Sequence, residues 1–194
     1  MRDVGTKNDV RIVSFSQLDE GAMQSVSQML IGDKSCSLDN MNVSCFASEL
    51  CNSSHASGTG DMNPMDISNS SLDTYALVSD ATVLAVAATR RMSDCEFLGM
   101  RSSIDLDDVL LLNLCVNKTT RAKGMGRTMI EHILKRSPGN VYVSVRLPDS
   151  NAPKTVQSFM QERSQNLVSL YKHMQFTHVE TTPSFAVLSR RSSL

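Results

Sequence analysis

The spacing of apolar residues along the chain predicts a mixture of strands and helices. Runs of β-prone or alternating residues predict strands, and apolar positions that recur every three to four residues predict helices. The expected strands cover residues 10–15, 74–78, 82–88, 109–116, 141–146, 177–180 and 185–189, and the expected helices cover 16–31, 43–51, 124–136 and 154–174. Elements in this order predict an α/β (α+β) fold, a mostly antiparallel sheet of about seven strands with helices packed on it.

The segment 33–74 differs in composition from the rest of the chain. It is rich in Ser, Asn, Asp and Met, and Lys34 is its one basic residue against six acidic ones. We expect a long acidic loop here, interrupted by the short helix at 43–51. Its negative charge would attract a cationic acceptor if the loop lay near a binding cleft, although such a charge run is more often a solvated loop.

Length and charge narrow the class of protein. The 194 residues and 41% hydrophobic content suit one domain, residues 1–194, with a sizeable core. With 19 basic and 20 acidic residues the formal charge is −1, so no overall positive field would attract a phosphate backbone. We therefore expect no nucleic-acid partner.

Cysteine usage and hydropathy favour a soluble, cytoplasmic protein. The five cysteines are an odd number and none is spaced as Cys-x-x-Cys, which fits reduced thiols in an intracellular compartment. Neither a signal-like apolar stretch at the N-terminus nor a run of 18 apolar residues occurs, so we expect no membrane partner. The four histidines lack metal-ligand spacing, and no metal site is expected.

The segment that carries candidate chemistry follows the most apolar strand. A short polar turn leads to Gly124 and Gly126, which open a helix. Glycine allows a ligand close to the backbone, and the first N–H groups of a helix have no internal partner and bind anions. Arg121, Lys123 and Arg127 add positive charge. The pattern predicts a phosphate or pyrophosphate cradle, although a glycine pair at a helix start can also be only a tight connection.

Two motifs place the chain near a known family. Met129 stands where a dinucleotide-binding fingerprint needs its third glycine, and no Walker loop is present. What remains, Arg-x-x-Gly-x-Gly over residues 121–126, resembles the acetyl-CoA motif of the GNAT superfamily of N-acetyltransferases. Residues 170–176 are similar to the family's Leu-Tyr-x-x-x-Gly-Phe, with Gln175 in place of glycine. The element order also resembles the GNAT fold, and the likeness covers about residues 10–190.

The resemblance implies an enzyme that transfers acetyl from the cosubstrate acetyl-CoA to a primary amine by direct attack. The acceptor would be a small cationic amine or a peptide or protein. Backbone groups of Leu114, Cys115 and Val116 would line the pantetheine arm. The pyrophosphate would be held by the turn and helix start, at residues Arg121, Ala122, Lys123, Gly124, Met125, Gly126 and Arg127.

The resemblance also implies catalytic roles. A backbone N–H near Val116 would stabilise the oxyanion, and Tyr171 would protonate the departing thiolate. Tyrosine suits this role because its unperturbed pKa of about 10 keeps it protonated at neutral pH. Tyr171 equally fits a half-buried aromatic of the core, and Cys115 fits a small core residue better than a nucleophile.

The chain departs from the family pattern at several positions. Leu110 occupies a place where some members carry a catalytic carboxylate. Asp108 shares its strand face and could act through water, or be a solvated acid at the strand entrance. Ser164 stands where the family often has Asn, and the segment 148–163 is longer than usual.

Two other functions fit the same residues. The missing base supports a non-catalytic, acyl-CoA-binding GNAT-like module that acts through a partner. A phosphate-binding α/β protein unrelated to acyl-CoA would also use the glycine turn. The acceptor, the oligomeric state and the roles of the segments 33–74 and 148–163 stay open.

Overall fold

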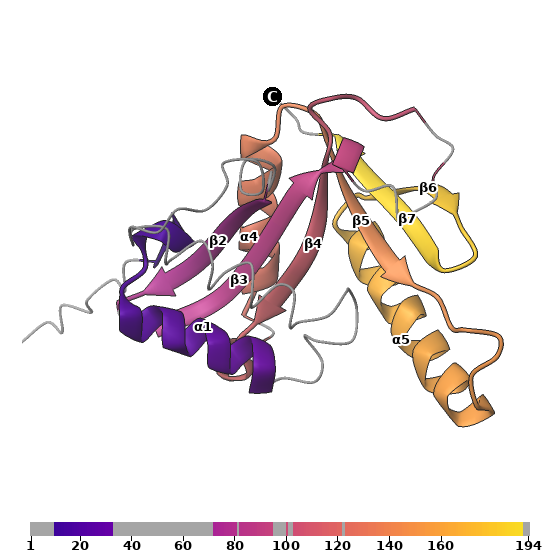
Figure 1. Cartoon of the computed structure of the whole chain (residues 1–194), viewed down its shortest axis with the longest axis horizontal. Coiled ribbons are helices and arrows are strands. Elements are labelled where there is room, and N and C mark those ends of the chain that lie inside the picture. The colour runs from indigo at the N-terminus through magenta and orange to yellow at the C-terminus, as the bar shows by residue number, and fades with distance from the viewer. Residues whose placement is uncertain are drawn as a thin grey trace, which may run out of the picture.

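One seven-stranded sheet with helices on both faces forms the protein in the computed structural model (Figure 1). The structure describes residues 10–32, 72–80, 82–94, 100, 103–121 and 123–191. The strands are β1 (Val10–Ser14), β2 (Leu72–Ser79), β3 (Thr82–Arg91), β4 (Val109–Val116), β5 (Asn140–Arg146), β6 (Thr177–Thr181) and β7 (Phe185–Arg191). The α-helices in the described ranges are α1 (Glu20–Gly32), α4 (Met125–Arg136) and α5 (Lys154–His173).

The strand order across the sheet is β1-β2-β3-β4-β5-β7-β6. All neighbours are antiparallel except β4 and β5, which are parallel. The mostly antiparallel sheet flanked by helices is therefore confirmed. Most of the acidic segment 33–74, including the expected helix at 43–51, lies outside the described residues.

The first helix begins later than its apolar pattern predicts. Residues Phe15–Gln17 form a single 3₁₀ turn, and α1 starts only at Glu20. The cap is Asp19, whose Oδ1 accepts a hydrogen bond from the Ala22 N–H at 2.7 Å. A carboxylate at this position satisfies an otherwise unpaired N–H and favours the positive end of the helix dipole, which explains the later start.

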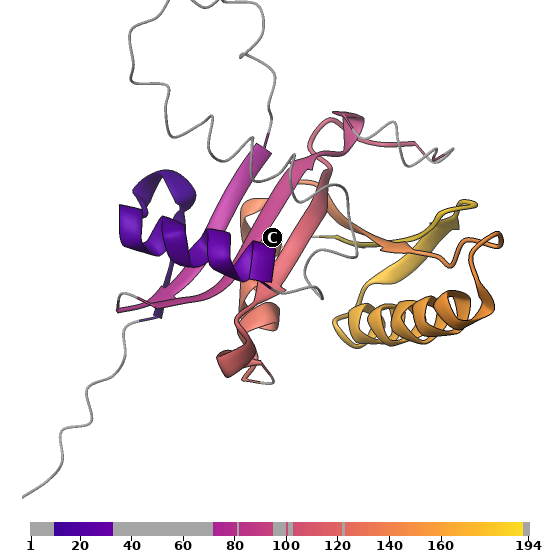
Figure 2. The ribbon, with the colours of Figure 1, turned by 60° about the horizontal axis from the view of Figure 1, so that its bottom comes forward.

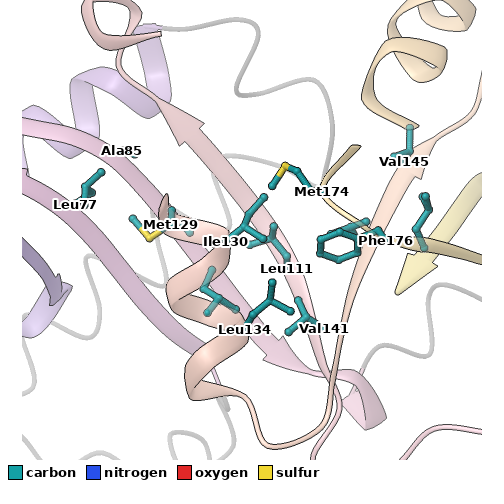
Figure 3. Packing of buried hydrophobic residues seen from close by; sticks show 14 of the residues in the cluster. Leu77, Ala85, Leu111, Met129, Ile130, Leu134, Val141, Val145, Met174 and Phe176 are labelled. Atoms are coloured by element: carbon teal, nitrogen blue, oxygen red, sulfur yellow. The ribbon is translucent and has the colours of Figure 1, made fainter. Parts of the chain in front are cut away.

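The main core lies between the sheet and the two helices α4 and α5, which cover the same face of the sheet (Figure 3). Met129, Ile130 and Leu134 of α4 are buried against Leu111 of β4 and Val141 of β5. Burying each such side chain contributes about 1.5–3 kcal/mol. This packing fixes the start of α4 against the end of β4, where the candidate chemistry lies.

Helix α1 lies on the opposite face of the sheet from α4 (Figures 1 and 2). A second cluster of buried residues lies under it. Cys115 of β4 belongs to this cluster, packed with Val26 and Leu30 of α1, and it is bonded in a disulfide. The expectation of reduced thiols is therefore wrong for this residue. Cysteine count and spacing could not reveal the pairing, because they carry no information on which sulfur atoms meet in space.

Helix α5 ends in a left-handed residue that is not glycine. Gln175 has φ 66°, the Gln175 N–H donates to the Lys172 carbonyl at 2.9 Å, and the Phe176 N–H donates to the Tyr171 carbonyl at 3.0 Å. These two bonds form a Schellman motif, whose left-handed position normally carries glycine. Gln175 takes that conformation at a steric cost.

We expect Gln175→Gly to raise the free energy of unfolding by about 0.5–1 kcal/mol, because it removes the Cβ that opposes the left-handed conformation. Urea denaturation measures the change. Gln175→Ala is the control: it keeps the Cβ and should give no gain. Equal stabilisation by both substitutions would contradict the steric explanation.

His132 of α4 makes the fold sensitive to acid. Its ring packs edge-on against Tyr75 at a centroid distance of 5.7 Å, and burial, with Arg136 and Lys135 nearby, lowers the pKa of His132 from its ordinary 6.5. The His132 ring therefore binds a proton more tightly in the unfolded chain than in the folded protein. As a result, the free energy of unfolding falls as the pH drops below 6.5. We expect His132→Phe to reduce this loss in urea titrations between neutral and acidic pH, and His178→Phe, at an exposed site, to leave it unchanged.

Candidate functional site

The parallel strands β4 and β5 separate halfway along their length. They pair only at Val109↔Val141, Leu110↔Tyr142 and Leu111↔Val143. Beyond that point the strands diverge, as Figure 1 shows. On the other edge of β4 the register with β3 shifts, so that Leu112 is an extra residue. A bulge of this kind bends the strand and ends its pairing with one neighbour.

The separation leaves backbone groups of β4 without a strand neighbour. The Asn117 N–H donates to the Leu84 carbonyl of β3 at 2.8 Å. Because backbone direction alternates along a strand, the amides of Leu114 and Val116 point away from β3, toward the gap. In agreement, the Val116 carbonyl accepts a hydrogen bond from Arg121 Nε at 3.4 Å instead of joining the ladder.

Two glycines shape the start of α4, directly beside this edge. Gly124 is the N-cap with φ 81°, and the first helical hydrogen bond runs from the Thr128 N–H to the Gly124 carbonyl at 3.0 Å. The N–H groups between them therefore have no intrahelical partner. A Cβ on Gly126 would lie 3.4 Å from Val116 Cγ2, so glycine lets the helix start pack closely against β4.

A cavity of about 760 Å³ occupies the space between the end of β4, the start of α4 and one side of α5. Eight of the residues predicted for the site line it: Leu114, Val116, Arg121, Gly124, Met125, Gly126, Arg127 and Tyr171. The strand edge, the glycine turn and the tyrosine, which come from three elements, thus meet in one cavity.

Two of the predicted residues that the structure describes are not part of this lining. Cys115 is buried on the α1 face of the sheet, away from the cavity. Lys123 is exposed, and its N–H donates to the Thr120 carbonyl at 3.3 Å within the turn. Ala122 lies outside the described residues. The anion-binding amides that the geometry offers are accordingly those from Met125 to Arg127.

Helix α5 supplies most of the lining that sequence reasoning missed. Phe159 and Leu170 are about half exposed along the cavity, and both belong to the apolar stripe that predicted the helix. Large apolar residues exposed together on a helix face indicate a groove or a partner, but the stripe alone does not show which of its residues stay exposed. The missed lining residues are Ile130, Phe159, Glu162, Arg163, Asn166, Leu167, Leu170, His173 and Met174.

Ser164 does not face the cavity. Its hydroxyl lies 2.6 Å from the Arg146 carbonyl of β5 and 2.7 Å from the Met160 carbonyl, and the residue is buried. The position where the related motif often carries Asn therefore anchors α5 to β5 here. Asn166, two residues later, is the amide side chain of α5 that lines the cavity.

The ring of Tyr171 belongs to both the cavity and the core. It lines the cavity and packs edge-on against Phe176, with ring centroids 5.5 Å apart at 63°. Both interpretations of this residue from the sequence thus describe part of its environment. The contact with Phe176 fixes the ring orientation, which any role for its hydroxyl would require.

Asp108 has a structural position at the closed end of the β4–β5 pair. It is 1% exposed, and its carboxylate accepts hydrogen bonds from the Asn140 N–H at 2.7 Å, from Asn140 Nδ2 at 3.0 Å and from the Asp105 N–H at 3.1 Å. Burial and the adjacent Asp108 carboxylate raise the pKa of Tyr142 to about 12. The expectation of a solvated acid is wrong, and so is that of a base acting through water, because its oxygens are already used to hold the two strands together.

Two further properties of the described chain bear on function. No helix in the described ranges is long and apolar enough to cross a membrane. Within the same ranges, no three His, Cys, Asp or Glu side chains gather as they would around a metal ion.

Comparison with known proteins gives similarity in structure without similarity in sequence. No protein-family model matches the chain, and no curated protein matches it. An aminoglycoside 6′-N-acetyltransferase complexed with coenzyme A is similar with a TM-score of 0.60 at 12% identity, over 93% of this chain and 96% of that chain. The ribosomal-protein-S18-alanine N-acetyltransferase from Escherichia coli is similar with a TM-score of 0.53 at 17% identity, over 96% of each chain.

A third solved structure that is similar to this chain is also an N-acetyltransferase. The N-acetyltransferase PseH from Campylobacter jejuni, in complex with acetyl coenzyme A, is similar with a TM-score of 0.54 at 11% identity, over 95% of this chain and 100% of that chain. At such identities the likeness concerns the fold. The chain therefore has the fold of the GNAT N-acetyltransferases, as its two motifs predicted.

Proposed function

We propose that this protein is an acetyl-CoA-dependent N-acetyltransferase that acetylates a primary amine. The observation that carries the proposal is the single cavity in which the open edge of β4, the glycine-initiated start of α4 and Tyr171 meet. The three similar structures are acetyltransferases, and two of them were solved with coenzyme A or acetyl coenzyme A, which supports the same cosubstrate here.

Each part of acetyl-CoA has a matching part of the cavity. The pantetheine arm carries amides, which can pair with the backbone of Leu114 and Val116 in place of β5. The pyrophosphate suits the unpaired N–H groups at the start of α4, where the helix dipole favours negative charge. Arg121 and Arg127 line the cavity beside these N–H groups and add positive charge.

The same geometry fits a direct acetyl transfer. The neutral amine attacks the thioester carbonyl carbon, a C–N bond forms, the C–S bond breaks, and the amine nitrogen releases a proton to water. The Val116 N–H is the donor available for the oxyanion, because it points into the gap. The Tyr171 hydroxyl supplies a proton to the departing sulfur, which releases coenzyme A as the thiol, and the phenolate then regains a proton from solvent.

Calorimetry with acetyl-CoA, followed by thiol release in the presence of amines, tests the proposal. We expect saturable binding and CoA thiol release with at least one member of a panel of polyamines, aminoglycosides, basic peptides and neutral primary amines. Absence of both binding heat and thermal stabilisation at millimolar acetyl-CoA would reject the proposal.

A non-catalytic acyl-CoA-binding module is the second candidate, favoured by one residue on β4 and one just before it. Leu110, which is fully buried, occupies the place where some family members carry a carboxylate, and the Asp108 carboxylate is held by three hydrogen bonds. This candidate predicts binding of acetyl-CoA without thiol release for any amine of the panel. The same two measurements therefore distinguish the candidates.

A further inference from the structure

A second, smaller cavity adjoins the first one between α4, the end of α5 and β7. Its volume is about 230 Å³, and its lining is Arg127, Glu131, His173, Met174, Gln175 and Arg190. Three of these residues, Arg127, His173 and Met174, also line the larger cavity. We call the smaller one the polar cavity, because five of its six lining side chains are charged or polar.

Hydrogen bonds position two of the basic side chains in the polar cavity. Arg190 Nη1 donates to the Met174 carbonyl at 2.9 Å, and the guanidinium is half-buried with further N–H groups to offer. His173 Nδ1 lies 2.7 Å from the Ser169 carbonyl. A carbonyl only accepts, so Nδ1 carries the hydrogen in that bond and Nε2 of the neutral ring is an acceptor.

The third basic side chain, Arg127, keeps its donors available within the described part of the chain, where it has no hydrogen bond or ion pair to another residue. Glu131 is the one acidic residue of the lining, against two arginines. The polar cavity therefore has an excess of donors and of positive charge, which suits an anion with several acceptor oxygens.

We infer that the polar cavity binds the 3′-phosphate of coenzyme A, an inference that rests on the proposed function. The 3′-phosphate and the pyrophosphate are attached to the same ribose, so their sites must be neighbours. The polar cavity meets this requirement: Arg127 borders both cavities, and Glu131 lies about 6 Å further along α4. A phosphomonoester carries about −1.5 to −2 charges at neutral pH and three strong acceptor oxygens.

The acidic residue of the lining fits the same ligand. The ribose of coenzyme A has a 2′-hydroxyl beside the 3′-phosphate, and a hydroxyl donates well to a carboxylate. Glu131 can accept this hydrogen bond while the phosphate contacts Arg190. A ligand without the 3′-phosphate keeps the first contact and loses the second.

The test compares coenzyme A with 3′-dephospho-coenzyme A by calorimetry on the full chain. We expect wild-type protein to bind coenzyme A about tenfold more tightly, the value of one or two charge-assisted hydrogen bonds. Arg190→Met should lose most of this preference by weakening coenzyme A alone. Arg191→Met, which removes an exposed arginine one residue along the same strand, is the matched control and should keep the preference.

A second variant moves the preference the other way without removing a structural contact. Glu131→Gln removes the negative charge of the polar cavity, so the preference for coenzyme A should rise about threefold. Equal affinity of the wild-type protein for both nucleotides, or an equal loss of both in Arg190→Met, would overturn the inference and leave the proposed function standing. If neither nucleotide binds wild-type protein, the proposed function fails as well.

Discussion

Gly124→Asp is expected to bind acetyl-CoA about 100-fold more weakly than Gly124→Asn. Both side chains have nearly the same shape, and both tolerate the left-handed conformation that φ 81° imposes at this N-cap. A Cβ on Gly124 would have nothing within 4 Å, so either side chain has room. The two variants therefore differ mainly in one negative charge beside the proposed pyrophosphate site.

The size of this effect follows from the charges. Two unit charges of like sign about 4 Å apart repel by about 4 kcal/mol at an effective dielectric constant of 20. Solvent at the rim of the cavity reduces this to about 3 kcal/mol, which corresponds to the 100-fold change. The carboxylate introduced by Gly124→Asp would also accept hydrogen bonds from the N–H groups that the pyrophosphate needs.

Calorimetric titration of both variants with acetyl-CoA gives the ratio of their affinities. Melting temperatures of the two variants should agree within a few degrees, which shows that the start of α4 folds in both. Wild-type affinity in Gly124→Asp would mean that the diphosphate does not lie at this helix start. An equal loss in both variants would assign the effect to side-chain size and reject the electrostatic explanation.

The elements of the fold were predictable because their signals are local. The apolar run of β4 predicted a strand covered on both faces, and β4 is flanked by β3 and β5 with a cluster on each side. The place of β7 between β5 and β6 was not predictable. The hairpin of β6 and β7 could pair with β5 through either strand and bury the same side chains. Tertiary packing decides which of the two strands lies next to β5.

The part of the site that is local in sequence was also predictable, and the part that depends on helix rotation was not. Turn chemistry alone located Gly124 and Gly126 at the start of α4. Asn166 was missed, because a motif fixes a position along α5 but the packing of the helix fixes which side faces the cavity. Asp108 was misjudged for a similar reason: its main partner, Asn140, lies 32 residues away in the sequence.

For the chemical step, Tyr171→Phe is expected to lower kcat about 100-fold while leaving the affinity for acetyl-CoA within about twofold of wild type. Phenylalanine keeps the edge-on packing against Phe176, so the substitution removes only the hydroxyl that would protonate the thiolate. Because the cosubstrate contacts proposed for the backbone of β4 and α4 are unchanged, the loss should fall on kcat rather than on binding.

Steady-state thiol release with the amine found in the panel measures this change, and calorimetry measures the binding. Tyr75→Phe is the matched control: it removes the hydroxyl of another half-buried tyrosine, which is not among the residues that line the cavity, and should leave kcat unchanged. An unchanged kcat in Tyr171→Phe would assign the residue to the core alone. The thiolate would then depart unprotonated and take its proton from solvent, which requires that water reaches the sulfur.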